Sequence, residues 1–172
     1  MDFIQTPTFE IFCQLLLAVL LGTFIGVERE FANKFAGMRT HALVAMGSAL
    51  FTIASTSIST GIVDPSALLG LQIDGVAIVS DPTRIAAQIV TGIGFLGAGL
   101  IVFHRSRVQG LTTAAGVWVA AAIGMAVGFQ LYLVAIFASI LTVLVFILLW
   151  PLERKFVVRF SGYTDGDEQG DR

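Results

Sequence analysis

The sequence predicts an all-α protein that crosses a membrane with five helices, its N-terminus outside and its C-terminus in the cytoplasm. Three observations predict this fold. The chain of 172 residues is 56% hydrophobic and 13% charged, whereas about a quarter of the residues of a soluble domain are charged. Its mean hydropathy is +0.87. Apolar segments long enough to cross a bilayer recur along it, and basic residues fall in alternate connections between them.

The first three spans are read directly from uncharged runs. They cover residues 11–27, 42–60 and 85–103. The third run has 19 residues without a charge. At about 1.5 Å per residue, a helix of this length matches a hydrocarbon core of about 30 Å. We expect Asp81 to cap this helix and Pro82 to occupy its first position.

The remaining apolar run is too long for one span. Residues 108–152 carry no charge, and one helix of that length would far exceed the bilayer core. We therefore expect a turn at 128–130 between a fourth span near 111–127 and a fifth near 131–150. Pro151 is expected to end the fifth span, and Thr112 and Thr113 are natural N-cap residues for the fourth.

The basic residues indicate the orientation. Nine of the ten fall on one side of a five-span arrangement, and Arg84 is the exception. Short loops rich in Lys and Arg stay in the cytoplasm, so the N-terminus is expected outside. Residues 1–160 would then form the transmembrane domain, with 61–83 as an outside connection. The acidic residues 161–172 would form a short disordered tail.

Small residues at helical spacing predict close helix packing, within one chain or between chains. Ladders of such residues occur in the first and fourth spans, and glycines are frequent in the third. A dinucleotide-binding role for the third-span glycines is rejected, because that motif needs a preceding strand. The expected packing glycines are Gly22, Gly26, Gly92, Gly94, Gly97, Gly99 and Gly124.

Arg84, Gln88 and Thr91 share one face of the third span. Polar groups facing lipid are costly, so this face should point into protein or a water-filled cavity. Three interpretations of Arg84 stay open: an interfacial anchor, an ion pair with Asp81, and a binding role.

A cluster of charged residues, which we call the first charged cluster, lies in the first cytoplasmic connection and contains both signs. Mutual salt bridges and a docking surface for another protein are the two interpretations. Its members are Glu28, Arg29, Glu30, Lys34, Arg39 and His41.

Several function classes are excluded by what the sequence lacks. A pI near 5.6 gives no reason to expect nucleic-acid binding. Sequence motifs of metalloproteases, serine hydrolases and P-loop enzymes are missing, so we expect no enzyme and no cofactor. Two isolated histidines do not predict a metal site. No carboxylate lies within a span, which argues against a pump, although backbone carbonyls could line a pore.

Four sequence blocks together resemble the MgtC/SapB family of bacterial inner-membrane proteins. They are GVERE, AGMRTHALVAMGSAL, DPTRIAAQIVTGIGFLGAGLI and GLTTAAGVWVAAAIGMAVG, in that order. The resemblance covers about residues 16–127 and continues more loosely to Trp150. It carries over these motif positions: Glu28, Arg29, Glu30, Gly37, Arg39, Thr40, Asp81, Arg84, Gln88, Gly92, Gly94, Phe95, Gly97, Gly99, Thr112, Thr113 and Trp118.

The resemblance implies a role in adaptation to low magnesium and in bacterial survival inside host cells. It implies a regulator in the inner membrane that binds other membrane proteins, with the F-type ATP synthase as one partner. Longer members carry a C-terminal domain resembling an ACT domain. We expect this chain to lack it, with residues 152–163 as at most a remnant of its first strand.

Two function classes stay open at this point. The first is the regulator, which the lack of carboxylates within the spans favours. The second is a small-ion channel or transporter with a polar path near Arg84, Gln88 and Thr91. In addition to the lipid bilayer, we expect a second copy as a partner, in a homodimer.

Overall fold

The computed structural model describes residues 7–59, 81–104 and 107–161, and these form five helices and one short hairpin. The predicted outside connection, up to residue 80, and the predicted tail, from residue 162, lie outside the described residues. The elements in chain order are α1 (Pro7–Phe31), α2 (Met38–Ser59), α4 (Pro82–Leu100), β1 (Val102–His104), β2 (Arg107–Gln109), α5 (Leu111–Gly128) and α6 (Tyr132–Ser161).

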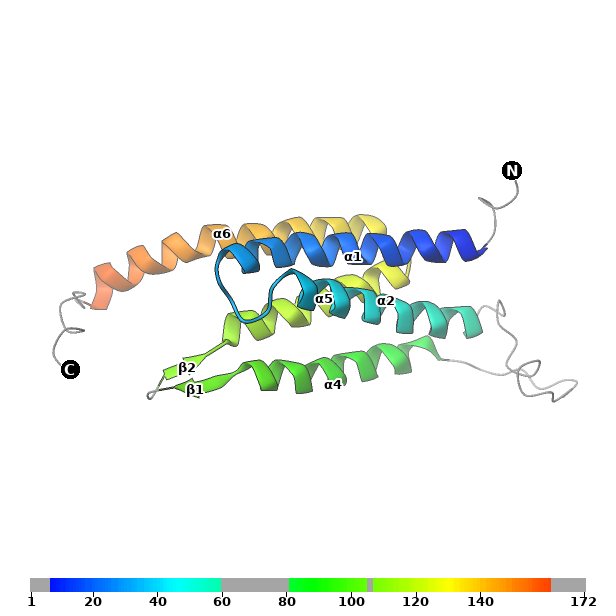
Figure 1. Cartoon of the computed structure of the whole chain (residues 1–172), viewed down its shortest axis with the longest axis horizontal. Coiled ribbons are helices and arrows are strands. Elements are labelled where there is room, and N and C mark those ends of the chain that lie inside the picture. Colours follow the sequence, from blue (N-terminus) through cyan, green and yellow to red (C-terminus); the bar gives the residue numbers. More distant parts are fainter. Residues whose placement is uncertain (1–6, 60–80, 105–106, 162–172) are drawn as a thin grey trace, which may run out of the picture.

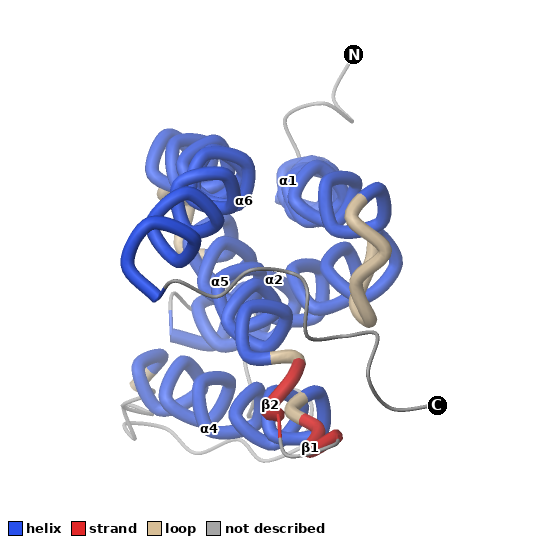
Figure 2. The backbone as a smooth tube through the Cα atoms, turned by 90° about the vertical axis from the view of Figure 1, so that its left-hand side faces the viewer, coloured by secondary structure: helices blue, strands red, loops and turns tan. Residues whose placement is uncertain are grey.

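The five helices run roughly along one long axis (Figure 1). Seen end on, α1 and α6 form one side, α2 and α5 the middle, and α4 the opposite side (Figure 2). The connection between α1 and α2 and the hairpin of β1 with β2 lie at the same end of the bundle. The chain alternates direction from one helix to the next, as the predicted sorting of basic residues requires.

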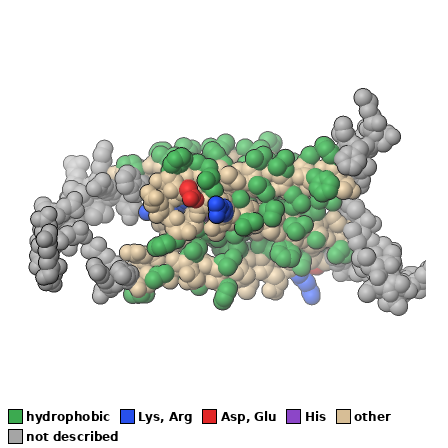
Figure 3. All heavy atoms as spheres, viewed as in Figure 1, with side chains coloured by type: hydrophobic (Ala, Val, Ile, Leu, Met, Phe, Trp, Pro, Cys, Tyr) green, Lys and Arg blue, Asp and Glu red, His purple; other side chains and the backbone are tan. Residues whose placement is uncertain are grey.

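All five helices are long and apolar enough to cross a membrane, so the predicted number of spans is confirmed for the described residues. Hydrophobic side chains cover most of the face in Figure 3, and charged side chains form small groups toward the ends. Large exposed side chains such as Leu133 (84% exposed) and Phe137 (68%) would be costly in water and are ordinary in lipid.

The centre of the bundle is built from small residues on α2 and α5. Ala45, Ala49 and Ala120 are fully buried. Gly124 lies so close to α2 that an added Cβ would be 2.1 Å from the carbonyl oxygen of Ala45. Without a side chain in the way at Gly124, the two backbones gain dispersion contacts at this point, which is how helices associate in lipid.

Gly22 and Gly26 play the same part between α1 and the start of α2. A Cβ at Gly22 would lie 2.5 Å from the carbonyl oxygen of His41, and one at Gly26 would lie 2.5 Å from the Cα of Met38. The first helix and the beginning of the second are therefore in backbone contact at the end of the bundle where the charged cluster lies.

The turn between α5 and α6 lies where the sequence predicts it. α5 ends at Gly128, and Gln130 takes a left-handed conformation with a φ of 62° before α6 begins. The start of α5 differs from the prediction, because neither Thr112 nor Thr113 caps it. The cap position is Gly110, at a φ of 90°, a conformation that glycine adopts without the usual steric penalty.

Several helix boundaries also differ from the prediction, and α2 begins at Met38, four residues before the predicted span. α1 continues beyond residue 27 and carries Glu28, Arg29 and Glu30 in its last turns, so these residues are helical. α4 begins at Pro82 with Asp81 as its cap, as predicted, but it ends at Leu100, three residues before the uncharged run does, because the hairpin follows it.

Pro151 does not end the last helix. It lies inside α6, which continues to Ser161, and the helix bends toward its C-terminal end in Figure 1. Proline removes one backbone hydrogen bond and bends a helix without necessarily ending it. The expectation of a strand remnant from residue 152 is accordingly wrong up to Ser161.

Candidate functional site

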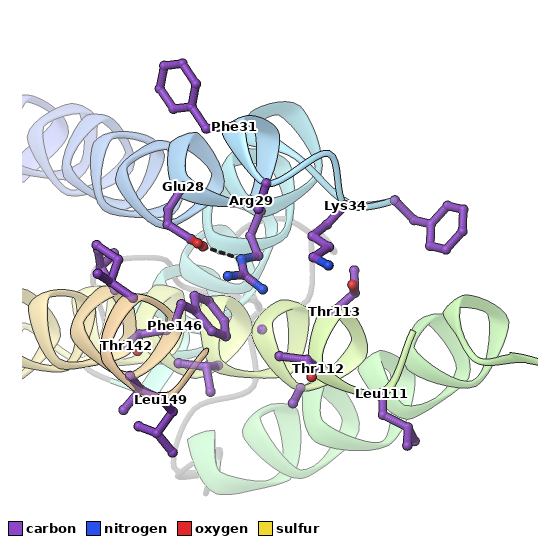
Figure 4. A pocket seen from close by; sticks show the side chains of 18 of the residues that line it. Glu28, Arg29, Phe31, Lys34, Leu111, Thr112, Thr113, Thr142, Phe146 and Leu149 are labelled. Atoms are coloured by element: carbon purple, nitrogen blue, oxygen red, sulfur yellow. Dashed lines mark hydrogen bonds and ion pairs between the residues drawn. The ribbon is translucent and has the colours of Figure 1, made fainter. Parts of the chain in front are cut away.

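A groove between α1, α5 and α6 opens at the end of the bundle where α1 ends and α5 begins (Figure 4). Its volume is about 1680 Å³. The walls are mainly apolar and include Phe24 of α1, Val119 of α5 and Leu149 of α6. Polar residues line its outer part: Glu28, Arg29, Asn33, Lys34, Gln109, Thr112 and Thr113. The structure thus brings part of the first charged cluster beside two threonines that are distant in sequence.

Arg29 is held at the wall of this groove by two contacts. Its Nε donates to a carboxylate oxygen of Glu28, and its guanidinium carbon lies 3.7 Å from the centre of the Phe146 ring on α6. The Arg29 side chain is 6% exposed and that of Glu28 19%. The face of an aromatic ring attracts a cation, and the paired carboxylate offsets part of the cost of burying the charge.

Behind this pair, His41 and Phe146 both face Gly116 of α5. His41 is fully buried, and its Nδ1 lies 2.9 Å from the carbonyl oxygen of Gly37. A carbonyl only accepts, so Nδ1 carries a proton, and in the neutral ring Nε2 is then an acceptor. Within the described part of the chain this Nε2 has no partner. Since an unpaired buried acceptor costs about 1–3 kcal/mol, packing must hold the ring in place.

Gly116 leaves the room that these two rings occupy. A Cβ there would lie 3.0 Å from Cζ of Phe146 and 3.2 Å from Nε2 of His41. Any larger residue at this position would press on both rings. It would also disturb the ring on which Arg29 stacks.

Glu30 and Gly37 have a structural role at the same end. The Glu30 carboxylate accepts the backbone N–H of Met38 at 3.1 Å, which satisfies a free donor at the start of α2. A Cβ at Gly37 would lie 1.7 Å from that carboxylate oxygen. The spacing from Glu30 to Gly37 in the motif is therefore explained by the start of the second helix.

Three motif residues near this site remain accessible. Arg39 is exposed, Thr40 is half-buried, and Thr112 is exposed at the mouth of the groove, whereas Thr113 is buried. Trp118 is 47% exposed, further along α5. Figure 4 shows Arg29 and Lys34 reaching from the end of α1 toward the beginning of α5.

The opposite end of the bundle carries Asp81 and Arg84. Asp81 caps α4 as predicted, accepting the backbone N–H of Thr83 at 2.9 Å and its hydroxyl at 2.6 Å. These two hydrogen bonds hold the pKa of Asp81 below its ordinary value, and the positive charge of Arg84 acts in the same direction. Among the described residues, however, the one salt bridge joins Arg29 and Glu28, so Asp81 and Arg84 form none.

The predicted polar face of α4 does not point into the chain. Arg84, Gln88 and Thr91 are all exposed, and Phe95 on the same face is 82% exposed. The expectation that this face lines protein or a cavity is wrong for the single chain. The hydroxyl of Thr91 instead bonds to the carbonyl oxygen of Ala87 in its own helix at 3.0 Å.

The glycines of α4 show the same difference. An added Cβ would meet nothing within 4 Å at Gly92, Gly94 or Gly99, and at Gly97 it would lie 3.8 Å from Ala114. The prediction that Gly92, Gly94 and Gly99 pack closely against another helix is therefore wrong within this chain. α4 touches α5 on its other side, where Ile93 is buried.

Two contacts of the bundle were missed by sequence reasoning. The contact of Phe146 with Arg29 could not be recognised from the sequence, because aromatic residues are common in apolar spans. Gln14 is 5% exposed and its amide donates to the Tyr132 hydroxyl at 3.0 Å, joining α1 to α6. A glutamine inside an apolar run could have been flagged, since such residues rarely face lipid.

Comparisons with known proteins agree with the sequence resemblance. The model of the MgtC family matches residues 15–155. A protein of Escherichia coli K12 named "Putative magnesium transporter YhiD" is 47% identical over 80% of this chain and 60% of its own length. "Protein MgtC" of Brucella abortus strain 2308 is 43% identical over 87% of this chain and 54% of its own length.

"Protein MgtC" of Salmonella typhimurium strain 14028s is 42% identical over 78% of this chain and 50% of its own length. The chain therefore spans between half and three-fifths of these curated relatives. No solved structure matches it. On the extent of the family match, which includes the helices that build the groove, the chain belongs to the MgtC family.

Proposed function

We propose that this chain is a regulatory protein of the bacterial inner membrane that acts by binding another membrane protein. In this proposal it serves adaptation to low magnesium and survival inside host cells, and it catalyses no reaction. The names of its relatives, which include MgtC and a putative magnesium transporter, support the link to magnesium. The F-type ATP synthase is the partner we propose to test first.

One observation carries the binding role. The first charged cluster lies at one end of the bundle, and its members divide into two sets. Glu28, Arg29, Glu30 and His41 are engaged in contacts within the chain. Lys34 and Arg39 are exposed, and Arg39, which lies outside the groove, is free to meet acidic groups of a partner. Charges placed in this way favour specific association more than catalysis.

By the sorting of basic residues, we infer that this end faces the cytoplasm and that the N-terminus lies outside. Cysteines placed one at a time at Lys34 and Thr83, in a Cys13→Ser background, test the inference in intact cells. An impermeant maleimide should label position 83 and leave position 34 unlabelled. The reverse pattern would overturn the orientation.

The binding role is tested by reconstituting the chain with purified F-type ATP synthase in lipid nanodiscs and capturing the chain by a tag. The wild type should retain the synthase, and Arg39→Glu should retain at least tenfold less. Arg84→Glu is the matched control, because it reverses an exposed charge at the other end of the bundle. Equal retention by both variants, or none by the wild type, contradicts the proposal.

A small-ion channel or transporter is the second candidate, and the name of the Escherichia coli relative favours it. Its path would use Arg84, Gln88 and Thr91. Because these side chains are exposed on the single chain, they could surround water only if a second copy covered α4.

We also propose that a second copy does pack on α4, as a homodimer. The uncovered glycines Gly92 and Gly99 allow close backbone approach, and the exposed Gln88 would gain a partner. In a Cys13→Ser background, Gly92→Cys should crosslink to itself in native membranes. Leu133→Cys, exposed on α6, should not. A monomer with both variants would refute the dimer.

A further inference from the structure

We propose that the groove between α1, α5 and α6 binds one phospholipid of net negative charge. Its phosphate would lie between Arg29 and Lys34, and an acyl chain would follow the wall formed by α5 and α6. The proposal does not depend on the regulatory role, since it concerns the lipid that the bundle holds.

The groove needs an apolar occupant. Its inner walls are formed by Phe24, Val119, Val145 and Leu149, all within helices that are apolar enough to cross a membrane. Water gains few hydrogen bonds against such walls, and an empty space would forfeit the dispersion contacts of the side chains around it. The groove measures about 1680 Å³, more than the roughly 300–1,000 Å³ of pockets for small metabolites. An extended amphiphile from the surrounding bilayer fits both its size and its walls.

The mouth of the groove supplies the charge for an anionic headgroup. The carboxylate of Glu28 is compensated by Arg29, so Lys34 leaves one net positive charge there. The guanidinium uses Nε for Glu28 and lies over the ring of Phe146, and its terminal nitrogens are further donors. Figure 4 shows the Arg29 and Lys34 side chains both pointing toward the start of α5, where Thr112 and Thr113 lie.

These groups match a phosphodiester. A phosphate oxygen accepts from guanidinium, ammonium and hydroxyl donors, and Arg29, Lys34 and Thr112 supply one of each. Basic pockets between transmembrane helices bind anionic headgroups in the same manner. Arg29 is also 6% exposed and fixed by its two contacts, so little side-chain entropy is lost on binding. A zwitterionic lipid would bring a second positive charge to a site that is already positive.

Native mass spectrometry of the full chain tests this proposal. The chain is released from nanodiscs that contain phosphatidylglycerol and phosphatidylcholine in equal amounts. One phosphatidylglycerol per chain should be retained in preference to phosphatidylcholine. Lys34→Gln should lower its retention about fivefold, which corresponds to about 1 kcal/mol for one basic residue. Arg84→Gln is the matched control, because it removes an exposed cation at the other end of the bundle, and it should leave retention unchanged.

A second pair of variants tests the apolar part of the groove. Ala115 lines the groove and is exposed, and Ala98 is exposed on α4 outside it. Ala115→Trp should fill the groove and abolish retention, while Ala98→Trp should not. Equal retention of both lipids, an equal effect of Lys34→Gln and Arg84→Gln, or retention that survives Ala115→Trp would overturn the proposal. So would a crosslink showing a helix of another chain in the groove.

Discussion

Gly124→Ala tests whether α2 and α5 approach each other as closely as the structure has them. The new Cβ would lie 2.1 Å from the carbonyl oxygen of Ala45 and 2.9 Å from its Cα. Ordinary van der Waals contact begins at 3.4 Å, and both atoms belong to the backbone, so neither can rotate away. The two helices must therefore separate by about 1 Å.

The free-energy cost follows from this separation. A gap of 0.5–1 Å forfeits about a quarter to a half of the dispersion energy of each contact. The fully buried Ala49 and Ala120 lie on the two separating helices. Overpacking a tight interior costs about 1–3 kcal/mol, and the better helix propensity of alanine returns up to about 1 kcal/mol. We expect a net loss of up to about 2 kcal/mol in the free energy of unfolding.

Gly47→Ala separates the steric cost from the propensity gain. It makes the same chemical change in α2, where nothing lies within 4 Å of the new Cβ. It should be neutral or slightly stabilising. Unfolding of both variants by SDS in mixed micelles, followed by circular dichroism, measures the difference. If Gly124→Ala is as stable as Gly47→Ala within about 0.5 kcal/mol, the close approach of α2 and α5 is wrong.

Three further predictions concern the two polar ends of the bundle. Gly116→Val should destabilise the protein by about 1–3 kcal/mol in the same unfolding assay, because it presses on the ring that supports Arg29; wild-type stability would contradict the packing. Arg29→Gln should lower the free energy of unfolding by about 1–3 kcal/mol, because it leaves the Glu28 carboxylate unpaired. Adding Glu28→Gln should recover part of this loss. If the costs of the two substitutions simply add, the two side chains are not coupled. Because the pKa of Asp81 is lowered, its cap is present at neutral pH and is lost as the pH falls through that pKa, below about 4. Amide hydrogen exchange of Thr83, corrected for its intrinsic pH dependence, should therefore accelerate below that pH in the wild type. It should not accelerate in Asp81→Asn.

The number of spans could be predicted from the sequence because it depends on lengths and charges alone. An uncharged run of 45 residues between 108 and 152 cannot cross a bilayer once, and Gly128 and Gln130 supply the turn. The Asp81 cap was equally local, since it needs only a carboxylate two residues before a free backbone donor.

The faces of the helices could not be predicted in this way. Helical spacing shows that Arg84, Gln88 and Thr91 share one side of α4, but not whether another helix of the chain covers that side. In water, hydrophobicity would indicate the covered side. In lipid both sides of a helix are apolar, and packing is decided by shape.

The candidate site depended on contacts between distant segments. Arg29 could be recognised as part of a charged cluster, but its position on Phe146 of α6 follows from how three helices cross. Pro151 shows the opposite failure, in which a local rule was applied too strictly. One lost hydrogen bond did not stop α6, which continues to Ser161.

Magnesium flux in sealed proteoliposomes tests most directly whether the protein regulates or transports. Vesicles loaded with a magnesium-sensitive dye would be prepared with the wild type, with Gln88→Leu and without protein. If the chain acts by binding a partner, the wild type should admit magnesium no faster than protein-free vesicles. A flux with the wild type that Gln88→Leu abolishes would show that the exposed polar face of α4 is an ion path, and it would contradict the regulatory account.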